Sequence, residues 1–266
     1  MTGDKLEPIE FQPEDYFRPW REQESIILGK IRSLKSGAPQ TLVFIVSEVF
    51  YASGRRVPLS DLVTHLEKTI AEPRIHVIVD GTNAVGNRRL VTADARWDSY
   101  VFSPQRWLTA IEPCGVLLVR NDLNGNGPVP PGLWETGKRR TDVRVRTLAG
   151  LVGAMDLIRE PGIEFFFSRC EKLRKEFRLA LPKTVQVVGD KSGLDETFIL
   201  SCCPEKDCKW RFDSASELED EVVSKSVKAS VLPLDPQQPW LRMTIPFYLD
   251  ARELNRLCTF LKATTK

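Results

Sequence analysis

The stretch from residue 40 to residue 80 constrains the fold more than any other part of the chain. It contains a continuous apolar run, TLVFIV, then the amphipathic segment PLSDLVTHLEKTI, then a second apolar run, RIHVIVD. Pro58 and Ser60 stand where the amphipathic segment begins, and both are typical of helix starts. A buried strand, a helix and another buried strand predict a βαβ unit and therefore a parallel sheet.

The rest of the chain changes character near residue 183. Before this point, strands are expected near 98–102 and 115–120, and helices near 141–159 and 162–180. After it, DETFILSC, CKWRFD and SVKASVLPL are typical of strands, SASELEDEVVSK of a helix, and WLRMTIPFYLDARELNRLCTFLKA of a strand, a turn and a closing helix. We expect an α/β fold in two parts: residues 1–160 with a mainly parallel sheet, and residues 161–266 as a small α+β domain.

The charge balance and the hydropathy exclude several classes of protein. Lys and Arg number 38 and Asp and Glu number 36, so no strong field favours nucleic acid or anionic lipid. The longest apolar runs are too short to span a bilayer, and the acidic N-terminal stretch lacks the apolar core of a signal peptide. The six cysteines are scattered and fit reduced thiols. We expect a cytoplasmic protein that binds neither nucleic acid nor membrane.

Two short motifs resemble known sites but lack essential parts of them. GLWETGKR, residues 132–139, has the frame of a phosphate-binding loop, but Arg139 replaces the Ser or Thr that holds magnesium. CCPEKDC brings three cysteines together, yet both histidines, His65 and His76, lie in the other half of the chain. We therefore expect no nucleotide site and no metal site.

Asp80 ends the second apolar strand. In open α/β sheets, ligands bind beyond the carboxyl ends of the strands, so an acid here can hold a cationic ring nitrogen or a ribose hydroxyl. The alternative is an aspartate that caps a helix or closes a turn. Position alone leaves both interpretations open.

Six segments in a fixed order resemble the class V aminotransferase family, fold type I of the pyridoxal-phosphate enzymes. That family includes cysteine desulfurases, isopenicillin-epimerase-like proteins and sulfoxide lyases. The resemblance runs from about residue 25 to the C-terminus and matches the later part of the family's chain. It implies a large cofactor-type domain truncated at its N-terminus, of which residues 1–160 are the remnant, followed by the small domain. The segments are VIVDGTNAVGN, DSYVFSPQRWL, GVLLVR, WETGKRRTD, FFFSRCEKLRKEF and WLRMTIPFYLDARELNRL.

The resemblance implies roles for single residues. Asp80 matches the aspartate that pairs with the pyridinium nitrogen of the cofactor. Asn83 lies near the position of the ring hydroxyl, and Ser103 matches a serine near the cofactor phosphate. Thr136 belongs to a loop that reaches a phosphate across a dimer. Arg242 matches the arginine that receives a substrate carboxylate, a group that an Arg fork binds bidentately.

The chain departs from the family pattern at the cofactor anchor. Gln105 and Arg106 stand where the family has His-Lys, and no lysine occurs between Lys68 and Lys138. Arginine stays protonated in proteins and cannot form the imine. The N-terminal part that supplies the phosphate amides and the stacking group of the family is also missing. We expect no cofactor, unless pyridoxal phosphate binds non-covalently or a partner chain supplies the missing groups.

The resemblance and its departures together imply a degenerate family member without lysine-dependent catalysis. It would act as a binding or scaffolding subunit, or bind a small carboxylate or phosphate ligand in a cleft lined by Asp80, Arg106 and Arg242. Two alternatives remain open: a cofactor-independent enzyme in which Asp80 and Arg106 are catalytic, and one half of a split pyridoxal-phosphate enzyme. Because the family builds its active site at a dimer interface, a homodimer or a partner chain is implied.

Overall fold

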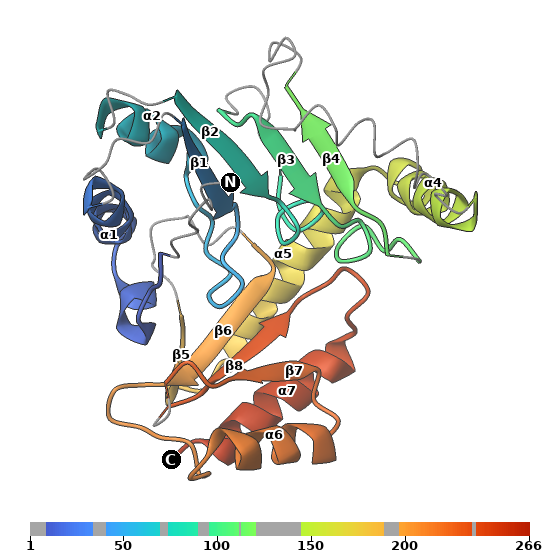
Figure 1. Ribbon diagram of the computed structural model, residues 1–266. Helices are drawn as coiled ribbons and strands as arrows, with labels where there is room; N and C mark the ends of the chain where they lie inside the picture. Colours follow the sequence, from blue (N-terminus) through green and yellow to red (C-terminus); the bar gives the residue numbers. More distant parts are fainter. Residues whose placement is uncertain are drawn as a thin grey trace.

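The computed structural model describes residues 9–33, 41–69, 74–89, 96–111, 113–120, 145–188, 197–235 and 238–266. Its strands form two four-stranded sheets (Figure 1). The first sheet has the order β1-β2-β3-β4, in which β1, β2 and β3 are parallel and β4 is antiparallel to β3. Its strands are β1 (Thr41–Ser47), β2 (Arg74–Asp80), β3 (Ser99–Phe102) and β4 (Val116–Val119).

The expected βαβ unit is confirmed, since α2 (Leu59–Thr69) connects β1 to β2. A short 3-10 helix, η1 (Pro13–Phe17), and α1 (Trp20–Ser33) precede it. Alternate strand residues point to opposite faces of a sheet, and one face of this sheet packs against α1 and α2. The core so formed contains Ile27, Ile31, Phe44, Val46, Leu62, Leu66, Val77, Val79 and Tyr100.

The opposite face of the first sheet is open to solvent at several apolar positions. Val43, Ile45, Val101 and Leu117 are exposed, although the register places them on one face of three different strands. Parallel sheets in α/β proteins are normally covered on both faces. These four side chains therefore form an exposed apolar surface on the sheet.

The second sheet is antiparallel throughout and has the order β5-β6-β8-β7. Together with its helices it confirms the expected α+β arrangement of the C-terminal half (Figure 1). Ser214 caps α6, and Asp250 with Glu253 forms a capping box at the start of α7, as the sequence signals of helix starts require. The elements are α5 (Ile163–Ala180), β5 (Val185–Val187), β6 (Ile199–Pro204), α6 (Ala215–Ser224), β7 (Ala229–Leu232), β8 (Trp240–Thr244) and α7 (Ala251–Thr264).

Two sequence expectations need adjustment. CKWRFD is not a strand: only Trp210 makes a single bridge, to Thr265. The indole of Trp210 is buried among the apolar residues of the C-terminal half, and its Nε1 donates to the Pro239 carbonyl at 2.6 Å. Trp210 is therefore a core residue and not part of a strand. The helix expected at 141–159 is α4 (Val145–Arg159), and residues 141–144 lie outside the described residues.

The segment after β1 ties the first sheet to the second. The Ser201 hydroxyl donates to the Ala52 carbonyl, and the Thr197 hydroxyl donates to the Gly54 carbonyl at 2.5 Å. Gly54 has φ +71°, and a Cβ there would lie 2.2 Å from the Ile199 carbonyl oxygen, so only glycine fits this contact. The two halves are therefore joined by buried polar contacts, while their division at residue 160 stays a prediction.

In the described part of the chain, no helix combines the length and the apolar character needed to cross a bilayer.

Candidate functional site

Asp80 lies at the carboxyl edge of the first sheet, as its position at the end of a strand predicts. The register places it between Ser47 at the end of β1 and Val101 in β3. Its Oδ2 accepts a hydrogen bond from the Ser47 hydroxyl at 3.4 Å, and its Oδ1 accepts from the Thr82 amide at 2.9 Å. The second contact is the turn-closing role that was the alternative interpretation. The carboxylate is half-buried, so a turn role and contact with a ligand are compatible.

A buried network of charged and polar side chains lies next to this edge of the sheet. Glu48 follows β1 directly; its carboxylate accepts from the Arg88 guanidinium through one oxygen and from the Tyr100 hydroxyl through the other. All three residues are buried. Burial, and then the charge of Glu48, raises the pKa of Tyr100, so the phenol stays protonated and acts as a donor. The network locks the ends of β1 and β3 to the loop after β2.

The turn after β3 presents Gln105 and Arg106 to solvent. The Arg106 amide donates to the Ser103 carbonyl at 3.3 Å, and the Leu108 amide donates to the Pro104 carbonyl at 3.1 Å. Thr109 closes the turn with φ +59°, a conformation that is strained for a β-branched residue. Such strain persists only where neighbouring contacts hold the backbone.

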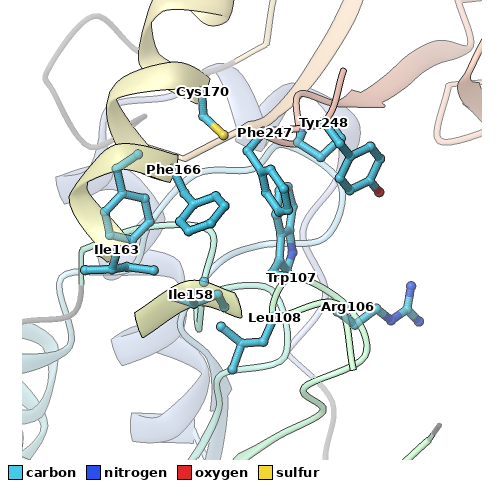
Figure 2. A pocket seen from close by; sticks show the side chains of 12 residues that line it. Arg106, Trp107, Leu108, Ile158, Ile163, Phe166, Cys170, Phe247 and Tyr248 are labelled. Carbon is cyan, nitrogen blue, oxygen red and sulfur yellow. The ribbon is translucent and has the colours of Figure 1, made fainter. Parts of the chain in front are cut away.

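The apolar contacts around this turn come from α4, α5 and the segment after β8. Figure 2 shows Trp107 and Leu108 pointing toward Phe166, Phe247 and Ile158, while Arg106 points away from them. The cavity they leave is about 20 Å³, which has room for about one water molecule. This volume is too small for a carboxylate or phosphate ligand, and Arg106 points away from the apolar walls. The full lining is Gly86, Arg106, Trp107, Leu108, Ile158, Ile163, Phe166, Phe167, Cys170, Pro246, Phe247 and Tyr248.

Arg242 in β8 faces the same region from the second sheet. Its Nε donates to the Tyr51 carbonyl at 2.8 Å, and its guanidinium carbon lies 4.2 Å from the centre of the Tyr51 ring. Burial lowers the pKa of Arg242, and the positive charge of Arg106 lowers it further, against the effect of Tyr51. The charge of one guanidinium group thus affects the pKa of the other, although the two come from opposite halves of the chain. Within the described residues, neither has a carboxylate as an ion-pair partner.

The other expected site residues are placed as follows. Ser103 is half-buried directly after β3, on the turn that carries Arg106. Asn83 is half-buried in the loop after Asp80, and its carbonyl accepts from Asn87 Nδ2 at 2.6 Å. Thr136 lies outside the described residues, as does the whole 132–139 motif. Asp80 thus lies beside Ser47, and the charge of Arg106 contributes to lowering the pKa of Arg242.

Sequence reasoning missed Glu48, Tyr51, Arg88 and Tyr100. Glu48 and Tyr51 immediately follow an apolar strand, which is a detectable signal for residues at the carboxyl edge of a sheet. The pairing of Glu48 with Arg88, 40 residues later, has no local signature. Only the sheet brings these two side chains together.

The cysteine cluster behaves as part of the core. Cys202 and Cys203 are buried in β6, where burial raises the pKa of Cys203 to about 12 and disfavours the thiolate that a metal needs. His65 is exposed on α2, and its Nδ1 lies 2.8 Å from Glu24 Oε1. Among the described residues, no three His, Cys, Asp or Glu side chains gather as a metal site would require.

Pyridoxal phosphate is the cofactor that the resemblance found in the sequence implies. Asp80 offers a carboxylate suited to a pyridinium nitrogen. The turn after β3 offers Gln105 and Arg106, neither of which can link covalently to an aldehyde. The described residues fit the ring-nitrogen contact but not covalent attachment at this turn.

Comparisons with known proteins identify the fold. No protein-family model matches the chain, and no curated protein matches it. Among solved structures, the cystine C–S lyase C-DES gives a TM-score of 0.68 at 16% identity, covering 91% of this chain and 65% of that chain. The cysteine desulfurase of Thermococcus onnurineus NA1 gives 0.67 at 16%, covering 97% and 66%. The cysteine desulfurase CsdA of Escherichia coli gives 0.65 at 14%, covering 89% and 61%.

This chain thus spans just under two thirds of the length of these proteins. At such identities the likeness concerns the fold, and it agrees with the resemblance found in the sequence. The chain has the class V aminotransferase fold of the pyridoxal-phosphate-dependent cysteine desulfurases and NifS-like proteins.

Proposed function

We propose that this chain binds a small carboxylate or phosphate anion non-covalently between Arg106 and Arg242, and that it does not perform lysine-dependent pyridoxal-phosphate catalysis. The observation that supports this most is that the positive charge of Arg106 contributes to lowering the pKa of Arg242, although the two residues come from opposite halves of the chain. Like charges repel, and an anion bound near both groups would relieve that repulsion.

The orientation of Arg242 suits this role. Its Nε donates to the Tyr51 carbonyl, and the face of its guanidinium group stacks on the Tyr51 ring. Within the described part of the chain, no other residue binds the terminal nitrogens, which suits a bidentate contact with a carboxylate or a phosphate. A guanidinium held on two sides loses little further conformational entropy when a ligand binds.

The turn after β3 supports the absence of lysine chemistry. The family resemblance places the covalent lysine on this turn, and the turn carries Arg106 instead. Packing of Trp107 and Leu108 against Phe166 and Phe247 supports a fixed conformation of this turn. No lysine lies within the turn in any case.

Titration calorimetry with succinate and with inorganic phosphate tests the proposal. Arg106→Gln and Arg242→Gln are each expected to weaken binding by about tenfold or more, since each removes a charge-assisted hydrogen-bonding group. Arg159→Gln, a charge change on the exposed surface of α4, is the matched control and should bind as the original chain does. Equal binding by all four proteins, or none by the original chain, would contradict the proposal.

A second candidate is a chain that works with a partner polypeptide supplying the missing part of a pyridoxal-phosphate site. The open apolar face at Val43, Ile45 and Val101 favours it, because a parallel sheet is normally covered there. The isolated chain should then bind an apolar fluorescent dye at this face, and Ile45→Lys should reduce that binding. A polypeptide matching the remaining third of a cysteine desulfurase should displace the dye. Failure to displace it would exclude this partner.

A further inference from the structure

We propose that the anion of the site at Arg106 and Arg242 carries an aromatic ring, and that this ring stacks on the side chain of Tyr248. The ligand class is therefore an aromatic carboxylate, and Tyr248 is the residue that selects it. This inference rests on the proposed function, because it assigns the chemistry of the ligand at the same site.

Tyr248 stands near the tip of a braced turn after β8. The Leu249 amide donates to the Pro246 carbonyl at 3.0 Å and closes the turn. Arg169 of α5 donates from Nε to the Phe247 carbonyl, and from Nη2 to the Leu249 carbonyl at 3.3 Å. These bonds hold the backbone on both sides of Tyr248, so the residue needs little further ordering when a ligand binds.

Tyr248 and Arg106 belong to one small region of the surface. Both line the same cavity, and Figure 2 shows both side chains pointing away from its apolar walls on the same side. The ring of Phe247 packs against that of Phe166, with 4.5 Å between their centres, and lies 5.2 Å from the ring of Tyr248 in a T-shaped contact. Despite this contact, Tyr248 stays 62% exposed, so its ring is accessible to a ligand that reaches Arg106.

Largely exposed aromatic side chains are few among the residues that the structure describes. They are Tyr51, Phe165 and Tyr248, and the two tyrosines accompany the two arginines of the anion site. Arg242 stacks on the ring of Tyr51, whereas no cation from the described part of the chain stacks on the ring of Tyr248. Tyr51 thus orients a guanidinium group, and Tyr248 remains for the ligand.

Another cation near Tyr248 is already paired. The pKa of Lys228 is raised, first by its hydrogen bond to Glu253 and to a smaller extent by Tyr248, and Lys228 forms an ion pair with Glu253. Arg106 has no carboxylate partner within the described residues. A carboxylate whose ring stacks on Tyr248 therefore gains more by binding Arg106 than by competing for Lys228.

Titration calorimetry with two acids of the same length, phenylpropionate and cyclohexylpropionate, tests the inference. The original chain should bind the phenyl acid about three- to tenfold more tightly, because aromatic pairs gain free energy beyond the burial of apolar area. Tyr248→Ala should remove this preference, whereas Tyr248→Phe keeps the ring and should retain it. Phe165→Ala, which removes a similarly exposed ring from α5, is the matched control and should bind as the original chain does. Circular dichroism checks that the variants are folded.

Succinate distinguishes a failure of this inference from a failure of the proposed function. If succinate binds and Arg242→Gln weakens its binding, but the original chain binds the two longer acids equally, the aromatic ligand is wrong and the anion site stands. If none of the three acids binds, the anion site is wrong and the inference falls with it. A preference for the phenyl acid that survives in Tyr248→Ala would place the ring elsewhere and overturn the role of Tyr248.

Discussion

The guanidinium of Arg242 lies over the ring of Tyr51, with 4.2 Å between its Cζ and the ring centre, and donates from Nε to the Tyr51 carbonyl at 2.8 Å. This contact joins β8 to the segment after β1, two parts of the chain that are 191 residues apart. It holds the Arg242 guanidinium in place through both its Nε and its planar face.

Replacing Arg242 by lysine should therefore weaken anion binding although the charge is kept. An ammonium cannot make the bidentate fork, and it lacks the planar face that stacks on Tyr51. We expect succinate binding to fall about tenfold in Arg242→Lys, measured by calorimetry. A lysine variant that binds succinate as well as the original chain would show that only charge matters, and the geometric part of the account would be wrong.

The buried network around Glu48 should contribute strongly to stability. Glu48→Gln removes one partner of the buried Arg88 pair, and breaking such a pair typically costs about 3–5 kcal/mol. Tyr100→Phe removes a single donor to Glu48 and should cost about 1–3 kcal/mol. Urea unfolding measures the change in the free energy of unfolding for both variants. Glu67→Gln, which breaks an exposed pair with Arg96, is the control and should change stability by less than about 1 kcal/mol.

The same network predicts a loss of stability at high pH. The pKa of Tyr100 is raised in the folded chain, whereas an unfolded tyrosine titrates near about 10. Below about pH 10 both states hold the proton and the stabilisation is complete; as the pH rises above about 10, the unfolded state releases its proton first and the stabilisation is lost. The stability difference between the original chain and Tyr100→Phe should stay constant up to that pH and then shrink. A difference that is constant throughout would contradict the raised pKa.

Asn87 is expected to hold the two halves in register. It is fully buried, its Oδ1 accepts from the Phe198 amide at 2.7 Å, and its Nδ2 donates to the Asn83 carbonyl. Asn87→Ala leaves two backbone groups unsatisfied and should cost about 2–4 kcal/mol in the free energy of unfolding. Asn255→Ala on the exposed side of α7 is the control, with an expected change within about 0.5 kcal/mol. An Asn87 variant as stable as this control would mean that water replaces the amide.

The turn after β3 can be tested for lysine chemistry by mass spectrometry. Pyridoxal phosphate is added, borohydride fixes any covalent link, and the peptide spanning residues 103–108 is analysed. The original chain should show no adduct there, while Arg106→Lys should gain one if the turn keeps the geometry of the fold. Arg159→Lys controls for unspecific modification of exposed amines. An adduct no greater than that of the control would contradict the placement of Arg106 at the lysine position.

The sequence was sufficient for the features that depend on local periodicity. The βαβ unit, α5 and the α+β content of the second half follow from apolar runs and helix-start residues that act within a few positions. The prediction of a strand at CKWRFD was wrong because Trp210 is a core residue outside a strand. An apolar residue between polar ones gives the same alternating pattern in both cases. Local pattern records which residues are apolar, not what they pack against.

The candidate site residues were predictable from the sequence only where their position relative to a strand marks them. Asp80 at a strand end and Arg106 after the next strand can be found in the sequence. The contacts that orient them cannot, because Tyr51 with Arg242 and Glu48 with Arg88 pair across long stretches of chain. Such pairs depend on the register of the sheets and the packing of the two halves, which no short segment encodes.

The most direct test of the central claim is a double-mutant cycle on anion binding. Succinate affinity is measured by calorimetry for the original chain, Arg106→Gln, Arg242→Gln and the double variant. If both guanidinium groups hold the same anion, the two losses should be non-additive, with a coupling energy of about 1 kcal/mol or more. Losses that add within about 0.5 kcal/mol would place the two arginines at independent sites and contradict the account.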